Sequence, residues 1–260
     1  MIKGAGDLAT GTAVRLHRAG FRVVMTDIAR PTAVRRTVAF CQCMYDGTAQ
    51  VEGIAARRVE TAEEAAACLT AGEVPVLADP EARIRTELPF DALVDAILAK
   101  RNLGTALTDA PIVLALGPGF TAGVDCHGVV ETKRGHYLGR LILAGSAIPN
   151  TGVPGIIKGY GTERLLRAPT DGYLLPVRKI GDEVSVGEVV GYVGGVEVCA
   201  RVDGVLRGLI HPRVRVTNGL KIGDVDPRGD PSHCWSITDK ALAIAGGVLE
   251  VIMSRDSNGK

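Results

Sequence analysis

The sequence predicts an α/β protein, with a Rossmann-like parallel sheet domain followed by a small β domain. Three observations lead to this fold class. Apolar runs of strand length alternate with helical periods up to about Leu116, a glycine-rich turn opens the chain, and a repeat of short strands begins near Arg167. Such alternation is typical of a parallel sheet covered by helices. We expect a nucleotide-binding domain at 1–162, a β domain at 163–229, and a C-terminal helix within 230–260 that packs back on the body.

The composition of the 260-residue chain is globular, with 46% hydrophobic and 23% charged residues and a net charge of +1. This balance gives no electrostatic reason to expect nucleic acid or an anionic membrane as a partner. No run reaches the roughly 18 apolar residues of a membrane span, and the first residues do not resemble a signal peptide. We therefore expect a cytoplasmic protein whose six cysteines are reduced thiols.

The elements of the first part can be placed in order. A helix follows the opening turn, a strand at 21–26 ends at Asp27, and a second helix is expected at 32–44. Thr61 begins an alanine-rich helix, because Thr61 to Glu64 has the spacing of a capping box. Further strands are predicted at 74–78, 93–98 and 112–116.

The opening turn, Gly4-Ala5-Gly6-Asp7-Leu8-Ala9, fits the dinucleotide-binding pattern G-x-G-x-x-G/A. Small residues let a pyrophosphate approach the backbone, and the N–H groups of the following helix point at the anion. An acidic residue at the end of the second strand can bind a ribose hydroxyl. Because only three residues precede Gly4, either the first strand is unusually short or the native start lies upstream. The predicted cofactor-binding residues in this region are Gly4, Gly6, Asp7, Ala9 and Asp27.

Further polar or glycine-rich segments follow the later predicted strands, where ligands of such sheets lie. Two follow strands directly, and a third carries basic groups that could contact an anion. The predicted cofactor-binding residues here are Lys100, Arg101, Asn102, Gly117, Gly119, Arg134 and His136.

His127 and Glu131 form a candidate catalytic pair. They share a face of an extended segment and are also neighbours on a helix, so an imidazole and a carboxylate can meet in either conformation. Such a pair suits proton transfer, although a structural hydrogen-bond network is an alternative. With His136 these residues could also bind a metal, but their spacing matches no recognised site, and we predict no metal.

The last third contains an internal repeat. Residues 170–174 recur at 202–206, and residues 184–189 recur at 220–225, which implies four extra residues in the second copy. Two such β units resemble the barrel-sandwich hybrid of biotinyl and lipoyl carrier domains. The expected hairpin, residues 194–199, lacks the modifiable lysine, which favours docking or ligand covering over a swinging arm.

Six segments spread over nearly the full length carry a family resemblance: 4–11, 99–102, 117–123, 131–136, 150–155 and 221–228. On these segments the chain resembles the selenium-dependent molybdenum hydroxylase system proteins, an accessory family of molybdenum-enzyme maturation. The resemblance implies a molybdenum hydroxylase client and a phosphate-bearing ligand, and the glycine turn is also similar to that of the xanthine dehydrogenase accessory proteins. By that analogy the ligand is a molybdopterin-type cofactor or a nucleotide. An accessory protein of this kind could also form a homo-oligomer.

Three other functions remain open at this point. One is an NAD(P)-dependent oxidoreductase with His127 or His136 as proton donor. Another is a sulfur- or selenium-transfer enzyme with Cys126 as nucleophile, activated by nearby positive charge. The last is a scaffold whose glycine turn binds nothing.

Overall fold

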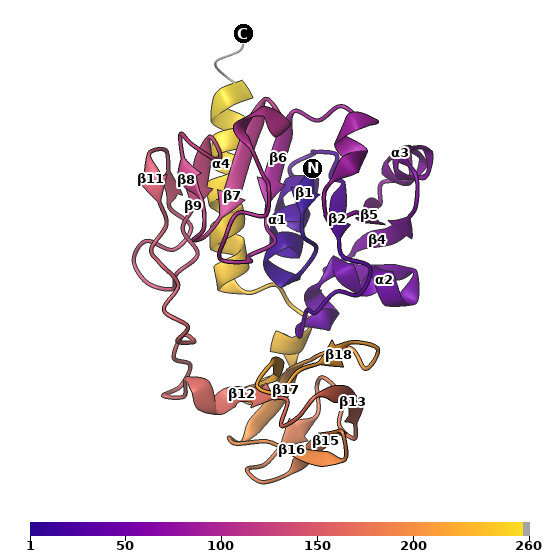
Figure 1. Cartoon of the computed structure of the whole chain (residues 1–260), viewed down its shortest axis with the longest axis vertical. Coiled ribbons are helices and arrows are strands. Elements are labelled where there is room, and N and C mark those ends of the chain that lie inside the picture. The colour runs from indigo at the N-terminus through magenta and orange to yellow at the C-terminus, as the bar shows by residue number, and fades with distance from the viewer. Residues whose placement is uncertain (257–260) are drawn as a thin grey trace. The chain divides into compact units, whose positions relative to one another are not determined.

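The computed structural model describes residues 1–256, and these fall into two compact units (Figure 1). Unit 1 comprises Met1–Ala29, Phe40–Thr151 and the segment from Ile237 on, and unit 2 comprises Arg30–Ala39 and Gly152–Ser236. The last residues of the predicted C-terminal segment, 257–260, lie outside the described residues.

Unit 1 is a mixed α/β structure built on a nine-stranded sheet. The strand order is β10-β9-β7-β6-β1-β2-β5-β4-β3, and every neighbouring pair is parallel except β3–β4 and β9–β10. A two-stranded sheet pairs β8 with β11. The strands are β1 (Ile2–Lys3), β2 (Met25–Asp27), β3 (Thr48–Val51), β4 (Ile54–Val59), β5 (Val74–Ala78), β6 (Ala92–Asp95), β7 (Ile112–Leu116), β8 (Thr121–Ala122), β9 (Gly128–Val130), β10 (Leu141–Ile142) and β11 (Gly145–Ser146).

The predicted strands at 74–78 and 112–116 are confirmed, and β1 has only two residues. Despite its length β1 lies inside the sheet, between β2 and β6. The chain leaves β1 to one side for β2 and returns on the other side for β6. The strand order therefore reverses beside β1, which is where ligands bind in sheets of this kind.

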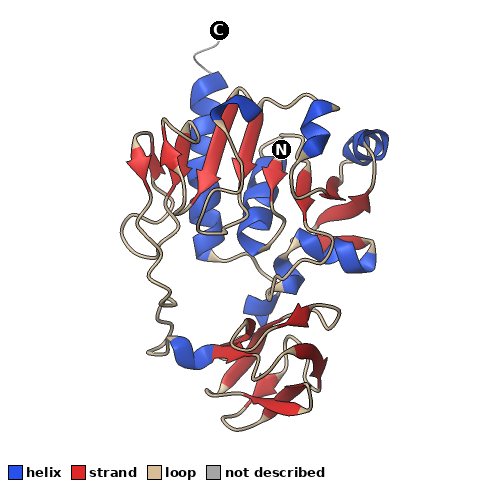
Figure 2. Ribbon diagram, in the orientation of Figure 1, coloured by secondary structure: helices blue, strands red, loops and turns tan. Residues whose placement is uncertain are grey.

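Helices cover the large sheet of unit 1 (Figure 2). Thr61 caps α3 as predicted, since its side chain accepts the N–H of Glu64. Helix α4 packs closely against α1, because a Cβ on Gly11 would lie 2.7 Å from the Cβ of Ala241. The helical segments are α1 (Asp7–Arg18), η2 (Phe40–Gln42), α2 (Cys43–Asp46), α3 (Ala62–Thr70), η3 (Arg83–Thr86), η4 (Leu107–Asp109) and α4 (Asp239–Asp256).

The helix predicted at 32–44 is wrong. The structure has the short turns η1 (Arg36–Val38) and η2 there, and α2 begins only at Cys43. Residues 30–39 instead belong to unit 2, where the N–H of Leu209 donates to the carbonyl of Val34 at 2.7 Å. A backbone engaged in this way cannot also form helical hydrogen bonds, so tertiary pairing overrides the local periodicity.

Unit 2 consists mainly of two four-stranded antiparallel sheets, with the orders β12-β19-β17-β14 and β16-β15-β13-β18. Short 3₁₀ turns precede and follow the strands. The elements are η5 (Thr162–Arg164), β12 (Leu165–Arg167), β13 (Gly172–Pro176), β14 (Glu183–Val184), β15 (Val189–Val193), β16 (Val196–Cys199), β17 (Gly204–Leu209), β18 (Arg215–Val216), β19 (Lys221–Asp226) and η6 (Pro231–Cys234).

The strand pairing corrects the sequence repeat. Leu174 pairs with Val193 as Leu206 pairs with Val225, and Gly172 pairs with Val216 as Gly204 pairs with Val184. These equivalent residues differ by 32 positions (206 − 174), so the expected four-residue insertion is wrong, and the only shift between the two pairings is a β-bulge between Leu206 and Gly208. One strand of each copy of the repeat pairs within the sheet of the other copy, since β14 pairs with β17 and β18 pairs with β13.

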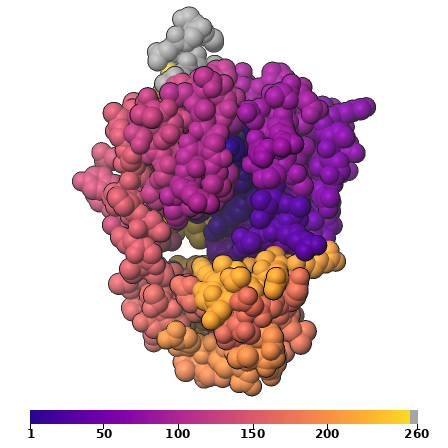
Figure 3. Space-filling model, viewed as in Figure 1, coloured from indigo at the N-terminus to yellow at the C-terminus, as the bar shows by residue number. Residues whose placement is uncertain are grey.

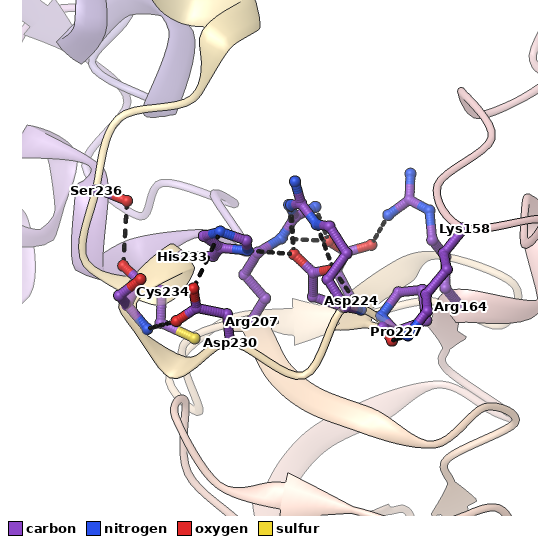
Figure 4. A network of polar contacts seen from close by, with 12 residues as sticks. Lys158, Arg164, Arg207, Asp224, Pro227, Asp230, His233, Cys234 and Ser236 are labelled. Atoms are coloured by element: carbon purple, nitrogen blue, oxygen red, sulfur yellow. Dashed lines mark hydrogen bonds and ion pairs between the residues drawn. The ribbon is translucent and has the colours of Figure 1, made fainter.

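A buried charge network holds the sheet of β17 and β19 together (Figure 4). Asp224 accepts hydrogen bonds from the guanidinium groups of both Arg164 and Arg207. Arg207 also bonds Asp226 at 3.2 Å, and Arg228 bonds Asp226 at 2.6 Å. The arginines hold the pKa of Asp226 far below its usual range despite the opposing effect of burial.

Residues 152–161 form a surface segment at the beginning of the longer stretch of unit 2, Gly152–Ser236, and are shown in pink in Figure 3. Its apolar side chains Val153 and Ile156 are exposed.

Within residues 1–256, every helix is too short or too polar to cross a lipid bilayer.

Candidate functional site

The glycine turn lies at the carboxyl end of β1, in unit 1. Gly4 has φ +94°, and a Cβ there would lie 2.8 Å from the carbonyl oxygen of Ala96. Gly4 therefore allows the turn to pack against the backbone that follows β6. Its N–H donates to the carbonyl of Thr26 at 2.7 Å, which continues the pairing with β2.

Helix α1 begins directly after this turn with an open N-terminus. Gly6 is its N-cap residue and supplies no side chain to accept the first N–H groups, and a Cβ there would meet nothing within 4 Å beyond its own chain neighbours. Asp7 is the first helical residue, and Ala9 is buried inside the unit. The positive end of the helix dipole is thus reachable at the point where the strand order reverses.

Asp27 braces the turn. Its carboxylate accepts the N–H of Ala5 at 2.8 Å and the N–H of Ile28 at 2.7 Å. Burial raises the pKa of Asp27, and these two hydrogen bonds oppose the rise. A ribose hydroxyl that donates to Asp27 would therefore compete with the N–H groups of Ala5 and Ile28 for its carboxylate.

The ammonium of Lys240 lies within electrostatic range of two further cationic side chains of unit 1, Lys100 and Arg134. Burial lowers the pKa of Lys240, and the positive charges of Lys100 and Arg134 lower it further, while Asp7 and Glu131 raise it. Partial burial also lowers the pKa of Lys100. Mutually repelling cations are a favourable setting for a bound anion. Sequence reasoning found Lys100 and Arg134 but missed Lys240, because no local pattern brings the start of α4 to the turn.

Arg134 is already paired in this structure. Its guanidinium makes two hydrogen bonds to the carboxylate of Asp239, at 2.8 and 3.0 Å. Its neighbour His136 is exposed and packs edge-on against Tyr137, with ring centroids 5.1 Å apart. An anion that engages Arg134 would compete with Asp239 for the guanidinium.

The loop after β6 carries Lys100 and is stabilised by the hydrogen bonds of Asn102 and Thr105. Asn102 donates to the carbonyl of Thr105 at 2.8 Å and accepts the N–H groups of Gly104 and Thr105. The hydroxyl of Thr105 donates to Asp95 at 2.6 Å and accepts from Lys3 at 2.7 Å. Asn102 is therefore a loop-bracing residue here, while Arg101 is exposed. The sequence did not indicate that Lys3 is buried and bonded to Thr105, because nothing distinguishes Lys3 from any other residue of a short strand.

The glycines after β7 allow close packing with neighbouring segments. A Cβ on Gly117 would lie 2.4 Å from the hydroxyl oxygen of Thr132, and one on Gly119 would lie 2.6 Å from the backbone nitrogen of Arg101. Both residues have positive φ, +77° and +111°. The structure thus gives Gly117 and Gly119 a packing role beside the loop that carries Lys100.

Gly119→Ala should be much more damaging than Gly123→Ala. Both glycines have positive φ, but the space around a Cβ on Gly123 is empty. We expect Gly123→Ala to cost about 1 kcal/mol of folding free energy from strain alone, and Gly119→Ala to cost about 2–3 kcal/mol because backbone must also move. Urea unfolding of both variants checks this, and equal losses would contradict the packing role.

His127 and Glu131 bond to different stretches of backbone. The Nδ1 atom of His127 accepts the N–H of Val113 at 2.9 Å. The buried carboxylate of Glu131 accepts the N–H groups of Lys133 at 2.7 Å and Ile148 at 2.8 Å. These contacts fit a structural role for both side chains better than proton transfer between them.

Cys126 is fully buried, and this burial raises the pKa of its thiol to about 11. At neutral pH such a thiol stays protonated, whereas a nucleophile requires the thiolate. Among residues 1–256, no group of three or more His, Cys, Asp or Glu side chains could hold a metal ion.

A cavity of about 540 Å³ lies at the ends of β4 and β5. Its lining includes the acidic residues Glu60, Asp79, Glu81 and Glu87 but only one arginine, Arg83. The surplus of negative charge makes this cavity unsuitable for a phosphate group. The cationic edge near α1 is the better candidate.

No family model matches the chain. It is 49% identical over 253 residues to the uncharacterized protein YqeB of Escherichia coli (strain K12). The alignment covers 97% of this chain and 47% of that protein, so the chain spans about half the length of this curated relative.

The similar solved structures are distant. A succinylglutamate desuccinylase/aspartoacylase from Rhodobacter sphaeroides is 27% identical over 24% of this chain and 22% of that chain, with a TM-score of 0.23. An aspartoacylase family protein from Mesorhizobium loti is 14% identical over 57% of this chain and 60% of that chain, with a TM-score of 0.26. Scores this low support no argument about fold or function.

Proposed function

We propose that this chain binds a phosphate-bearing cofactor or nucleotide at the carboxyl edge of β1 and β6, and acts as an accessory protein in the maturation of a selenium-dependent molybdenum hydroxylase. The binding role rests on the site geometry. The maturation role and the client enzyme rest on the resemblance of the sequence motifs. The free cysteines fit the expected cytoplasmic location.

One observation carries the binding proposal: Lys240 lies within electrostatic range both of Asp7, the first residue of α1, and of the cations Lys100 and Arg134. Burial and mutual repulsion disfavour the charged state of Lys240. A bound phosphate would reverse that effect, because an anion favours the protonated ammonium. It would also accept hydrogen bonds from the first N–H groups of α1.

These donors fit the phosphate end of a molybdopterin-type cofactor or of a nucleotide. Lys100 and Lys240 would hold the phosphate, and Arg134 would join them by exchanging Asp239 for the ligand. Such a cofactor would supply its own metal and pterin chemistry when bound. The residues of this edge contribute binding and charge neutralisation.

Unit 2 is proposed to be a barrel-sandwich hybrid that serves in docking. The support is the exchange of β14 and β18 between its two sheets, together with the repeat of 32 residues. The hairpin of β15 and β16 turns at Gly194 and Gly195 and carries no lysine. This fits a docking module better than a carrier of a covalently attached group.

Lys240→Gln should weaken binding of inorganic pyrophosphate about tenfold, because one of the converging charges is lost. Lys179→Gln, which removes an exposed lysine of unit 2, is the matched control and should leave affinity unchanged. Isothermal titration at low salt measures both. Equal affinities for the two variants would overturn the site.

Mass spectrometry of the protein purified under native conditions then identifies the ligand. A retained pterin or nucleotide that is lost in Lys240→Gln supports cofactor handling. Thermal shift with NAD, NADP and cytidine nucleotides tests the same edge by mass action. Turnover of NAD(P)H with a small substrate would favour the oxidoreductase instead.

A further inference from the structure

The two sheets of unit 2 differ in what covers their outer faces. By the sequence offset of 32 residues, Leu175 on β13 aligns with Arg207 on β17, and Tyr192 on β15 aligns with Asp224 on β19. A β-bulge after Leu206 makes Gly208 the register partner of Asp224, and Arg207 is the extra residue of that bulge. Arg207 and Asp224 are charged, yet both are buried. Leu175 is apolar, yet 66% of it is exposed. This is the reverse of the ordinary distribution of polar and apolar residues.

The chain itself covers the charged face. The carbonyl of Leu209 on β17 accepts a hydrogen bond from Arg36, and the thiol of Cys234 in η6 donates to the carbonyl of Leu206. His233, also in η6, lies 3.5 Å from Asp226. Residues 34–39 and η6 thus close over this sheet. Neither segment covers the exposed side chain of Leu175.

The uncovered face has a regular layout, defined here as the Leu175 face. Leu175 pairs with Tyr192, and Tyr192 pairs with Glu197 on the edge strand β16. Tyr173, two residues from Leu175 and 53% exposed, pairs with Arg215 on the opposite edge strand β18. Paired residues in antiparallel strands point to the same side. The face therefore has a negative edge, an apolar centre and a positive edge.

This layout is complementary to itself. A two-fold axis running roughly along the strands through the centre would place Glu197 of one copy near Arg215 of the other, with Leu175 and the tyrosines between them. In this arrangement Glu197 of one copy and Arg215 of the other are offset along the strand direction by one row of paired residues, about 7 Å. Long Glu and Arg side chains can span this offset. Among residues 1–256, neither Glu197 nor Arg215 has an ion-pair partner of its own.

We propose that the Leu175 face is a dimerisation surface whose partner is a second copy of this chain. Four short strands offer roughly 300 Å² of face, less than the ~800 Å² per partner of a stable interface. The dimer should therefore be weak and depend on concentration.

Charge exchange tests the arrangement. Sedimentation velocity of the full chain over a wide concentration range should show a monomer–dimer equilibrium. Glu197→Arg and Arg215→Glu should each weaken association about tenfold or more, because like charges then meet across the axis. The double variant E197R/R215E should restore it, since the two edges are merely exchanged.

Leu175→Asp should abolish the dimer, whereas Val186→Asp should not, because Val186 is comparably exposed (62%) but lies in the turn between β14 and β15. Fluorescence of Trp235 checks that each variant is folded. A chain that stays monomeric at every concentration overturns the proposal, as does a dimer that survives Leu175→Asp. Failure of the double variant to restore association overturns the two-fold arrangement.

Discussion

Asp224→Ala is expected to destabilise unit 2 by about 3–5 kcal/mol, because it leaves two buried guanidinium groups without their shared carboxylate. Arg164 and Arg207 are both buried and both bond to Asp224. Neither arginine can lose its charge near neutral pH. The loss therefore cannot be relieved by deprotonation, and it approaches the upper range seen for single substitutions.

The chain provides a convenient probe and control for this measurement. Trp235 is the single tryptophan and belongs to unit 2, so its fluorescence during urea unfolding reports on that unit. Arg178→Met removes an ion pair with Glu188 in which the Arg178 side chain is 47% exposed, and it should cost at most about 1 kcal/mol. If Asp224→Ala shifts the transition no more than Arg178→Met, the network does not stabilise unit 2.

The sequence predicted features that depend on local pattern. The capping box at Thr61 and the strands at 74–78 and 112–116 follow from spacing and turn residues. The helix expected at 32–44 failed because that segment pairs with β17, far away in the chain. The correct repeat offset emerged only from strand pairing, since several short matches were compatible with the sequence.

The candidate site was predictable in part for the same reason. The glycine turn and Lys100 lie near predicted strand ends, and the general rule for parallel sheets places them at one edge. Lys240 and the pairing of Arg134 with Asp239 depend on how α4 packs on α1, which periodicity cannot specify. Asp27 shows a further limit: its position was predicted, but its hydrogen bonds go to the turn itself.

For the 260-residue chain prepared with a free amino group on Met1, the folding stability should rise with pH between about 5 and 8. The amino group of Met1 is buried, donates to the carbonyl of Ala92 at 2.7 Å, and has its pKa lowered by burial from 8.0 to about 5. In this window the unfolded chain binds a proton that the folded chain does not, so acid favours unfolding. The full effect is about 4 kcal/mol, lost progressively as the pH falls from 8 to 5.

Urea unfolding followed by circular dichroism, from pH 5.5 to 8.5, measures this dependence. The control is the same chain with an acetylated Met1 amine, which has no charge to lose and should be less sensitive to pH. Identical pH dependence in the two forms would show that the amine is solvated. Because the acetylated nitrogen still carries an N–H for Ala92, a difference between the two forms reports the burial of charge rather than the loss of a hydrogen bond. Histidines and carboxylates elsewhere titrate in both forms, so their contributions cancel in the comparison.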